Sequence, residues 1–245
     1  MSGKDKLRKF RENETFSCLM QPATDELLGK DYRLKGKWAS EYFRNSNPIV
    51  LELGCGKGEY TVGLALANRD VNYIGMDIKG ARLWKGAKYV TEHSVANAAF
   101  LRTRIEFIDS IFAPGEVSEI WITFADPQIN KERRRLTSPM FLERYSRIMP
   151  HGGIIHLKTD SKYLYSYTRA LAVSNGLSIL ADTEDLYASG EPEGPLSIKT
   201  FYESHYLRMG MPINYISFRL DNDRPLVSPD WDGSELAAMH VRIKF

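Results

Sequence analysis

The chain has 245 residues, of which 43% are hydrophobic and 26% charged, and its formal net charge is +2. This balance excludes wholesale disorder and is typical of a globular protein with a substantial core. Two cysteines and five scattered histidines give no metal-ligand spacing, and no apolar run is long enough to span a membrane. We therefore expect a cytoplasmic protein that uses neither a metal ion nor a membrane.

The first part of the chain, residues 1–35, is polar and mixed in charge. We expect it to form an arm in front of a single domain over residues 36–245. Basic residues gather in this arm between Lys4 and Arg11, and again in the run 131–135. Such runs can contact nucleic acid, although most charge runs are solvated surface.

Hydrophobic periodicity predicts a regular alternation of strands and helices after a first helix over residues 37–45. Seven strands are predicted, at residues 49–54, 71–78, 98–103, 119–126, 152–160, 177–186 and 213–220. Helices are predicted between them, at residues 59–68, 79–93, 138–149, 162–176 and 200–210. This order predicts an α/β fold with a doubly wound, mostly parallel, seven-stranded sheet that has one antiparallel strand. The C-terminal tail ends in a possible further edge strand at 239–245.

A glycine-rich turn joins the first predicted strand to the helix after it, with glycines at Gly54, Gly56 and Gly58. A dinucleotide fingerprint would have its third glycine at position 59, where this chain has Glu59. Glu52, at the end of the strand, would also repel a pyrophosphate. Glycines beside a carboxylate favour a ligand with hydroxyl groups and a positive charge, and S-adenosylmethionine is such a ligand.

Four carboxylates follow the same rule of position: Glu52, Asp77, Asp126 and Asp160 all stand at the carboxyl ends of predicted strands. A lone aspartate there is most often a helix cap. Because the carboxyl ends of parallel strands meet at one edge of the sheet, four such residues predict a shared functional site. Cys55, inside the glycine turn, is interpreted as a small residue that fits the turn and not as a nucleophile.

Five short segments, in this order, resemble the bacterial tRNA (guanine-N7)-methyltransferases over roughly residues 48–220. They are ELGCGKGEY, NYIGMDI, FADP with the following KERRRL, LKTD and TFYE. The resemblance implies a Rossmann-like class I methyltransferase fold. It also implies methyl transfer from S-adenosylmethionine to N7 of guanosine 46 in the variable loop of tRNA, with tRNA as the partner. Separately, no exposed apolar stripe stands out in the sequence, so a monomer is the default state.

The resemblance assigns one group of residues to the cofactor. Glu52 matches the acid near the methionine end, beside Gly54 and Gly56 of the glycine turn. Asp77 matches the acid that accepts hydrogen bonds from the ribose hydroxyls. Near the adenine, Glu106 is the best match, with Thr103 and Arg104 as near neighbours, because the stretch RTRIE departs from the usual family pattern.

A second group matches the substrate side of the family's site. Asp126 matches the catalytic acid, which would orient the guanine and stabilise the positive charge that develops on it. The loop after Pro127 departs from the family pattern: it lacks the usual Trp-Pro and is about two residues shorter. The family's substrate-binding lysine falls on Asn130 when no gap is placed in this loop and on Lys131 with one gap, and the role is assigned to Lys131. Further substrate contacts are implied for Asp160, Thr200, Tyr202 and Glu203, and RNA phosphate contacts for Arg133, Arg134 and Arg135.

Two other functions are compatible with parts of the sequence. A methyltransferase of the same fold could act on another RNA, a protein or a small molecule, and the missing Trp-Pro favours this mildly. A non-catalytic RNA-binding module is the other alternative, against which the acids Glu52 and Asp77 argue. The basic loop together with the segments LKTD and TFYE favours tRNA as the substrate.

Overall fold

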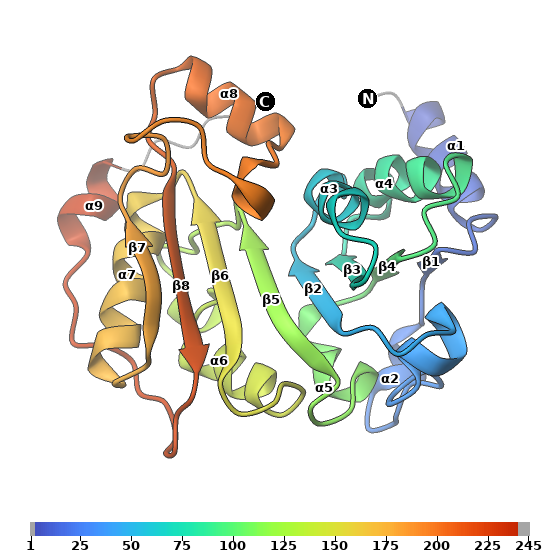
Figure 1. Ribbon diagram of the computed structural model, residues 1–245, viewed down its shortest axis with the longest axis horizontal. Helices are drawn as coiled ribbons and strands as arrows, with labels where there is room; N and C mark the ends of the chain where they lie inside the picture. Colours follow the sequence, from blue (N-terminus) through green and yellow to red (C-terminus); the bar gives the residue numbers. More distant parts are fainter. Residues whose placement is uncertain (1–2, 240–245) are drawn as a thin grey trace.

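The computed structural model describes residues 3–239, and one eight-stranded sheet runs through it in the order β1-β4-β3-β2-β5-β6-β8-β7 (Figure 1). The strands are β1 (Leu19–Met20), β2 (Ile49–Leu53), β3 (Asn72–Asp77), β4 (Ala98–Arg102), β5 (Val117–Thr123), β6 (Gly153–Thr159), β7 (Ile179–Thr183) and β8 (Asn214–Leu220). β8 is antiparallel to both of its neighbours, and the other pairs are parallel. The predicted fold class is confirmed, but the predicted number of seven strands is wrong by one.

The eighth strand comes from the segment expected to be a polar arm. Leu19 and Met20 form β1, which pairs with β4 at one edge of the sheet. The helix before it, α1 (Gly3–Asn13), packs on α4 (Gly80–Glu92), where the Asn13 amide donates to the Gly80 carbonyl at 2.9 Å. Helix α2 (Thr24–Leu27) brings the fully buried Leu27 into the core. Residues 3–35 are thus part of the packed fold.

Helices cover both faces of the sheet, as the alternation of side chains along β2 requires. The remaining helices are α3 (Glu59–Ala67), α5 (Ile108–Ile111), α6 (Pro139–Ser146), α7 (Lys162–Ser174), α8 (Phe201–Arg208) and α9 (Ser234–Met239). Ile49, Leu51 and Leu53 belong to the core beneath α5, α6 and α7, whereas Val50 belongs to the core beneath α3 and α4. The short turns are η1 (Trp38–Phe43), η2 (Ile105–Phe107), η3 (Glu132–Arg134) and η4 (Gly194–Ser197).

The helix expected at 37–45 is confirmed as η1, which is wound as a π-helix and ends where Arg44 takes φ 55°. The possible edge strand at 239–245 lies outside the described residues, apart from Met239. Within residues 3–239, none of the helices has the length and apolar character needed to cross a bilayer.

Candidate active site

A cavity of about 730 Å³ opens at the carboxyl ends of β2 to β6, the edge where ligands bind in open α/β sheets. Eight residues singled out from the sequence line it: Gly54, Asp77, Thr103, Arg104, Glu106, Asp126, Arg134 and Asp160. The structure thus brings together residues that lie more than a hundred positions apart in the chain. The other predicted site residues do not line this cavity: Glu52, Gly56, Lys131, Arg133, Arg135, Thr200, Tyr202 and Glu203.

Asp77 closes the glycine turn from the end of β3. One of its carboxylate oxygens accepts from the Gly56 N–H at 2.9 Å, and the other accepts from the Lys79 N–H at 2.7 Å. Gly54 faces the same cavity with φ +75°, and a Cβ at that position would have no neighbour closer than the Leu136 side chain at 3.8 Å. The Asp77 carboxylate, whose oxygens can each accept a further hydrogen bond, therefore lies beside the accessible backbone of Gly54.

Glu52 lies beneath this turn and not in the cavity. Its side chain is 3% exposed. One oxygen accepts from the backbone N–H and the hydroxyl of Thr61, and the other accepts from the Thr123 hydroxyl at 2.6 Å. Burial raises the pKa of Glu52 to about 7 despite these donors. Strand alternation turns Glu52 toward α3, and its expected contact with the methionine end of a cofactor stays a prediction.

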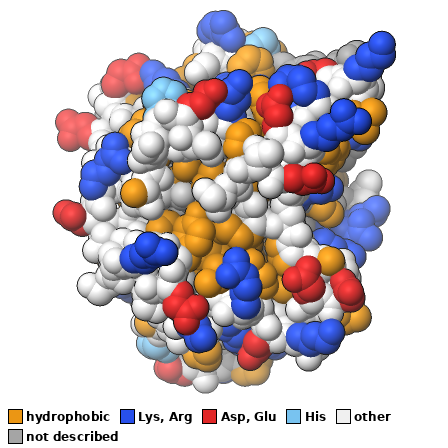
Figure 2. Space-filling view, turned by 90° about the vertical axis from the view of Figure 1, so that its right-hand side faces the viewer, with side chains coloured by type: hydrophobic (Ala, Val, Ile, Leu, Met, Phe, Trp, Pro, Cys, Tyr) orange, Lys and Arg blue, Asp and Glu red, His pale blue; other side chains and the backbone are white. Residues whose placement is uncertain are grey.

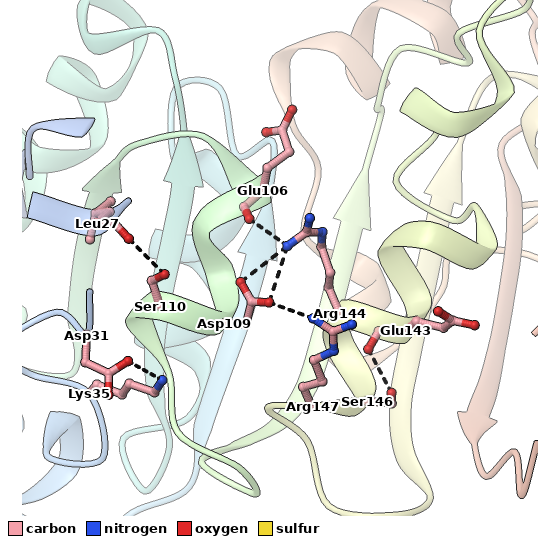
Figure 3. A network of polar contacts seen from close by, with 10 residues as sticks. All are labelled: Leu27, Asp31, Lys35, Glu106, Asp109, Ser110, Glu143, Arg144, Ser146 and Arg147. Carbon is pink, nitrogen blue, oxygen red and sulfur yellow. Dashed lines mark hydrogen bonds and ion pairs between the residues drawn. The ribbon is translucent and has the colours of Figure 1, made fainter. Parts of the chain in front are cut away.

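The η2 turn forms one wall of the cavity, and α6 holds it in place (Figure 3). Arg144 of α6 donates to the Glu106 carbonyl at 2.9 Å and to both oxygens of Asp109 at 3.3 Å. Arg147 donates to Asp109 at 3.0 Å. The Glu106 side chain points away from this network and carries only a loose ion pair with Arg104 at 3.4 Å.

Asp126 stands at the opposite wall, where the chain leaves β5 through two residues with positive φ, Phe124 at 50° and Gln128 at 48°. Its carboxylate accepts from the Gln128 N–H at 2.9 Å, which fixes the turn, while the residue itself is exposed at the cavity. Positive φ is costly for residues other than glycine. The chain holds this conformation at the point where it presents Asp126.

Asp160 follows β6 directly and faces Tyr206 of α8, a residue that the sequence analysis missed. Burial and the nearby Asp160 carboxylate raise the pKa of Tyr206. The ring of Tyr206 stacks near that of Phe124, with their centroids 6.1 Å apart. Tyr206 lies four residues after Tyr202, and this helical spacing was the available signal that two aromatic residues share one face.

The basic loop splits into two kinds of residue. Arg135 is 4% exposed; its guanidinium donates to the Pro127 and Ile129 carbonyls at 3.2 and 3.0 Å and lies 4.3 Å from the centre of the Tyr167 ring. The expected phosphate contact is therefore not open to Arg135, which holds the loop after Asp126 from inside. Lys131, Arg133 and Arg134 remain exposed.

Thr200 and Glu203 form the N-terminal cap of α8. The Thr200 hydroxyl accepts from the Glu203 N–H at 3.1 Å, and the Glu203 carboxylate accepts from the Thr200 N–H at 3.4 Å. Glu203 is fully buried and forms an ion pair with Lys158 at 2.6 Å. The expected contact of Glu203 with a guanine edge is thus absent in this conformation. Tyr202 is half-buried near Lys57, whose Nζ lies 5.9 Å from the centre of its ring.

Within residues 3–239, His, Cys, Asp and Glu side chains form no group of three or more that could hold a metal ion. The cavity offers instead carboxylates, backbone and apolar surface, including Ile78, which is 59% exposed beside Asp77.

Comparison with known proteins identifies close relatives. A family model described as "Putative methyltransferase" matches residues 46–215. A tRNA (guanine-N(7)-)-methyltransferase of Christiangramia forsetii is 52% identical over 223 residues, which make up 90% of this chain and 100% of the relative. Another of that name from Porphyromonas gingivalis is 53% identical over 190 residues, 77% of this chain and 78% of the relative.

Solved structures share the fold at low sequence identity. The 16S rRNA methyltransferase KamB has a TM-score of 0.57 and 17% identity, with 79% of this chain and 92% of that chain covered. A 16S rRNA (adenine(1408)-N(1))-methyltransferase from Catenulisporales acidiphilia, a mutant solved with cosubstrate SAM, has a TM-score of 0.52 and 10% identity, with 80% and 96% covered.

Proposed function

Since this chain belongs to the family of the bacterial tRNA (guanine-N(7)-)-methyltransferases, we propose that it methylates N7 of guanosine 46 in the variable loop of tRNA, with S-adenosylmethionine as methyl donor. One observation carries this proposal. A single cavity has the glycine turn and Asp77 on one side and Asp126, Asp160 and Tyr206 on the other. A methyl donor and a base can therefore meet in one cavity.

The residues around the glycine turn fit S-adenosylmethionine. Asp77 uses one lone pair of each oxygen on a backbone N–H, and the remaining pairs can accept the two ribose hydroxyls. Gly54 leaves room for the ligand to approach the backbone. Ile78 and Ile105 offer apolar surface for the purine, with Glu106 at its edge. When bound, the cofactor would supply a methyl group on a sulfonium, from which a neutral thioether departs as a good leaving group.

The opposite wall fits guanine. N7 carries an exposed lone pair, so the reaction needs no base; it needs the purine held edge-on near the methyl group. Asp126 can accept hydrogen bonds from the N1 and N2 hydrogens and stabilise the positive charge that the purine acquires. Asp160 and Tyr206 lie beside Asp126 at the same cavity. The raised pKa of Tyr206 keeps its hydroxyl protonated, so it can donate a hydrogen bond to the Asp160 carboxylate and fix its position. Lys131, Arg133 and Arg134 lie on the loop after Asp126, where RNA phosphates would approach.

The direct test is to incubate the protein with unmodified tRNA and methyl-labelled S-adenosylmethionine and to map 7-methylguanosine by chemical cleavage. The expected product is labelled at guanosine 46, and a tRNA with adenosine at that position is the matched control. Label at another guanosine would overturn the assignment of the position. Label on protein and none on tRNA would overturn the substrate class.

Asp126 can be tested without disturbing its turn. Asp126→Asn keeps an oxygen for the Gln128 N–H but removes the negative charge. It is expected to lower kcat by about 100-fold or more while the Kd for S-adenosylmethionine stays unchanged. Single-turnover methylation and titration calorimetry measure the two quantities. Asp232→Asn is the control, because Asp232 accepts the Ser234 N–H at 2.9 Å in the same way, away from the cavity. Near-normal turnover of Asp126→Asn would refute this role.

A further inference from the structure

Lys158 of β6 and Glu203 of α8 form an ion pair that has no contact with solvent. Both side chains are 0% exposed, and the Nζ to Oε1 distance is 2.6 Å. The two other donors of Lys158 go to the carbonyls of Leu196 and Ile198, at 2.8 and 3.1 Å, in and after η4. All three ammonium N–H bonds are thus used within the protein.

The segment that leads into α8 is fastened at further points. The Tyr187 hydroxyl donates to Glu203 at 2.7 Å. From α3, which begins at the glycine turn, the Tyr60 hydroxyl donates to the Pro195 carbonyl at 2.7 Å and the Glu59 carboxylate accepts from the Phe201 N–H at 2.8 Å. Figure 1 shows α8 at the upper end of β6, at the sheet edge where the cavity lies.

The spacing along both elements ties this ion pair to the cavity. Lys158 and Asp160 are two positions apart at the end of β6, and Glu203 and Tyr206 are three positions apart on α8, so each pair can share a face. Two contacts therefore join the same strand end and the same helix. One is the buried Lys158–Glu203 pair, and the other is the approach of Tyr206 to Asp160 at the cavity.

Stability alone is a poor reason for such a pair. Burying two charges costs several kcal/mol per ion, and well-packed apolar residues often serve a fold as well or better. What a buried pair with fixed hydrogen bonds can supply is a single arrangement of the elements that it joins. Here those elements are the strand end and the helix that carry two residues of the guanine side.

We propose that Lys158 and Glu203 are positioning residues that hold α8 in the one arrangement in which Tyr206 faces Asp160 across the substrate side of the cavity. This inference rests on the proposed function for the identity of the substrate. It also accounts for the TFYE segment, whose glutamate then acts from within the protein and not by touching the guanine.

The test uses the variants Lys158→Met and Glu203→Gln and the double variant that combines them. For each we would measure kcat and KM for tRNA, the Kd for S-adenosylmethionine, and the hydrogen exchange of residues 201–208 in the free protein. Each single variant is expected to lower kcat/KM for tRNA about tenfold, with cofactor Kd within about twofold, since each breaks the ion pair on the substrate side. Lys158→Met also removes the donors to the Leu196 and Ile198 carbonyls and is expected to be the more impaired of the two. The kcat/KM of the double variant should be no lower than that of the more impaired single variant, because both substitutions break the same ion pair. Losses that multiply in the double variant would overturn the proposal, since they would show that Glu203 acts separately from Lys158.

A milder pair of variants keeps the test decisive if a charge-breaking variant fails to fold. Tyr187→Phe removes one donor to Glu203 and leaves the ion pair, and is expected to lower kcat/KM a few-fold and to speed exchange in α8. Tyr165→Phe is the matched control, because its hydroxyl donates to the Asp182 carboxylate at 2.5 Å, away from the cavity. Unchanged exchange and kinetics in Tyr187→Phe would overturn the positioning role. If the wild type does not methylate tRNA, the proposed function fails, while hydrogen exchange still decides whether the pair holds α8.

Discussion

Glu52 is a carboxylate inside the sheet whose two oxygens meet donors from two neighbouring elements. Thr61 of α3 supplies two donors, and Thr123 of β5 supplies one. Three hydrogen bonds favour the ionised form, but removal from water disfavours it more, so burial wins and the pKa rises to about 7. The residue thus braces the strand end that carries the glycine turn.

This raised pKa predicts a pH dependence of stability. The pKa of Glu52 is about 7 in the folded chain against an ordinary value of 4.5 for a glutamate, so the folded state holds the proton more tightly than the unfolded state. The stabilisation is fully present below about pH 4.5 and is lost as pH rises through about 7, a fall of about 3 kcal/mol in the unfolding free energy. Glu52→Gln should lack this fall, because its amide can accept from Thr61 and donate to Thr123 without titrating.

Urea unfolding of both proteins at about pH 4.5 and pH 8 measures the effect. Comparing the two proteins cancels the contributions of all other titrating groups. Relative to the wild type, Glu52→Gln should gain about 3 kcal/mol between the two pH values. A difference between the proteins that stays constant with pH would show that Glu52 has an ordinary pKa.

Among the elements, η2 depends on a neighbour for its place. It is three residues long, too short to be stable alone, and it supplies Ile105 and Glu106 to the cavity wall. Arg144 joins its backbone to α6 through the Glu106 carbonyl and also bonds Asp109 at the start of α5 (Figure 3). The wall of the cavity that we propose for the cofactor is thus positioned from a helix that contributes no predicted site residue.

Substitution of Arg144 should therefore weaken cofactor binding. Arg144→Met removes the donor to the Glu106 carbonyl and the ion pair with Asp109, and is expected to raise the Kd for S-adenosylmethionine about tenfold, as the loss of charged hydrogen bonds worth about 1.5–3 kcal/mol predicts. Arg147→Met is the control, because Arg147 bonds only Asp109 and is 60% exposed. Titration calorimetry measures both. Equal affinities in the two variants would mean that η2 holds its position without Arg144.

Interactions between residues close in sequence could be predicted for these elements, whereas interactions between distant residues could not. The strands and the residues that follow them were predictable, because a buried strand is an apolar run and the acid after it is local. The partner of Glu203 was not, since Lys158 is 45 positions away and nothing in either segment links them. The Thr200–Glu203 spacing had a local explanation as a capping box, which the structure shows.

At the scale of the molecule, the N-terminal segment and the distribution of charge decide where RNA can lie. Residues 3–20 are polar enough to resemble a detached arm, yet a two-residue strand and contacts such as Glu12 to the Trp84 indole, at 2.6 Å, fix them to the domain. Such short pairings leave no periodic pattern in a sequence. Figure 2 shows the face on the N-terminal side, where basic and acidic side chains are interspersed around an apolar area. This face has no uniform basic field.

We propose that the exposed arginines of the loop after Asp126 meet tRNA phosphates, since Arg134 lines the cavity itself and Arg133 precedes it. Each phosphate contact contributes about 0.7–0.9 to the slope of log Kd against log salt concentration. Arg133→Ala with Arg134→Ala should therefore weaken tRNA binding and reduce that slope by about 1.5. Binding measured between about 50 and 200 mM salt gives the slope.

Arg169→Ala supplies the comparison for this slope. Arg169 is an exposed arginine of α7 paired with Asp182 at 2.7 Å, away from the cavity, so its loss changes the net charge without removing a proposed phosphate contact. If net charge alone attracted the RNA, Arg169→Ala would lower the slope by half as much as the double variant. If the slope is unchanged in Arg169→Ala but reduced in the loop variant, the RNA lies over the same edge of the sheet that holds Asp126. The loop after Asp126 would then contact the RNA phosphates at the same edge where Asp126 binds the base.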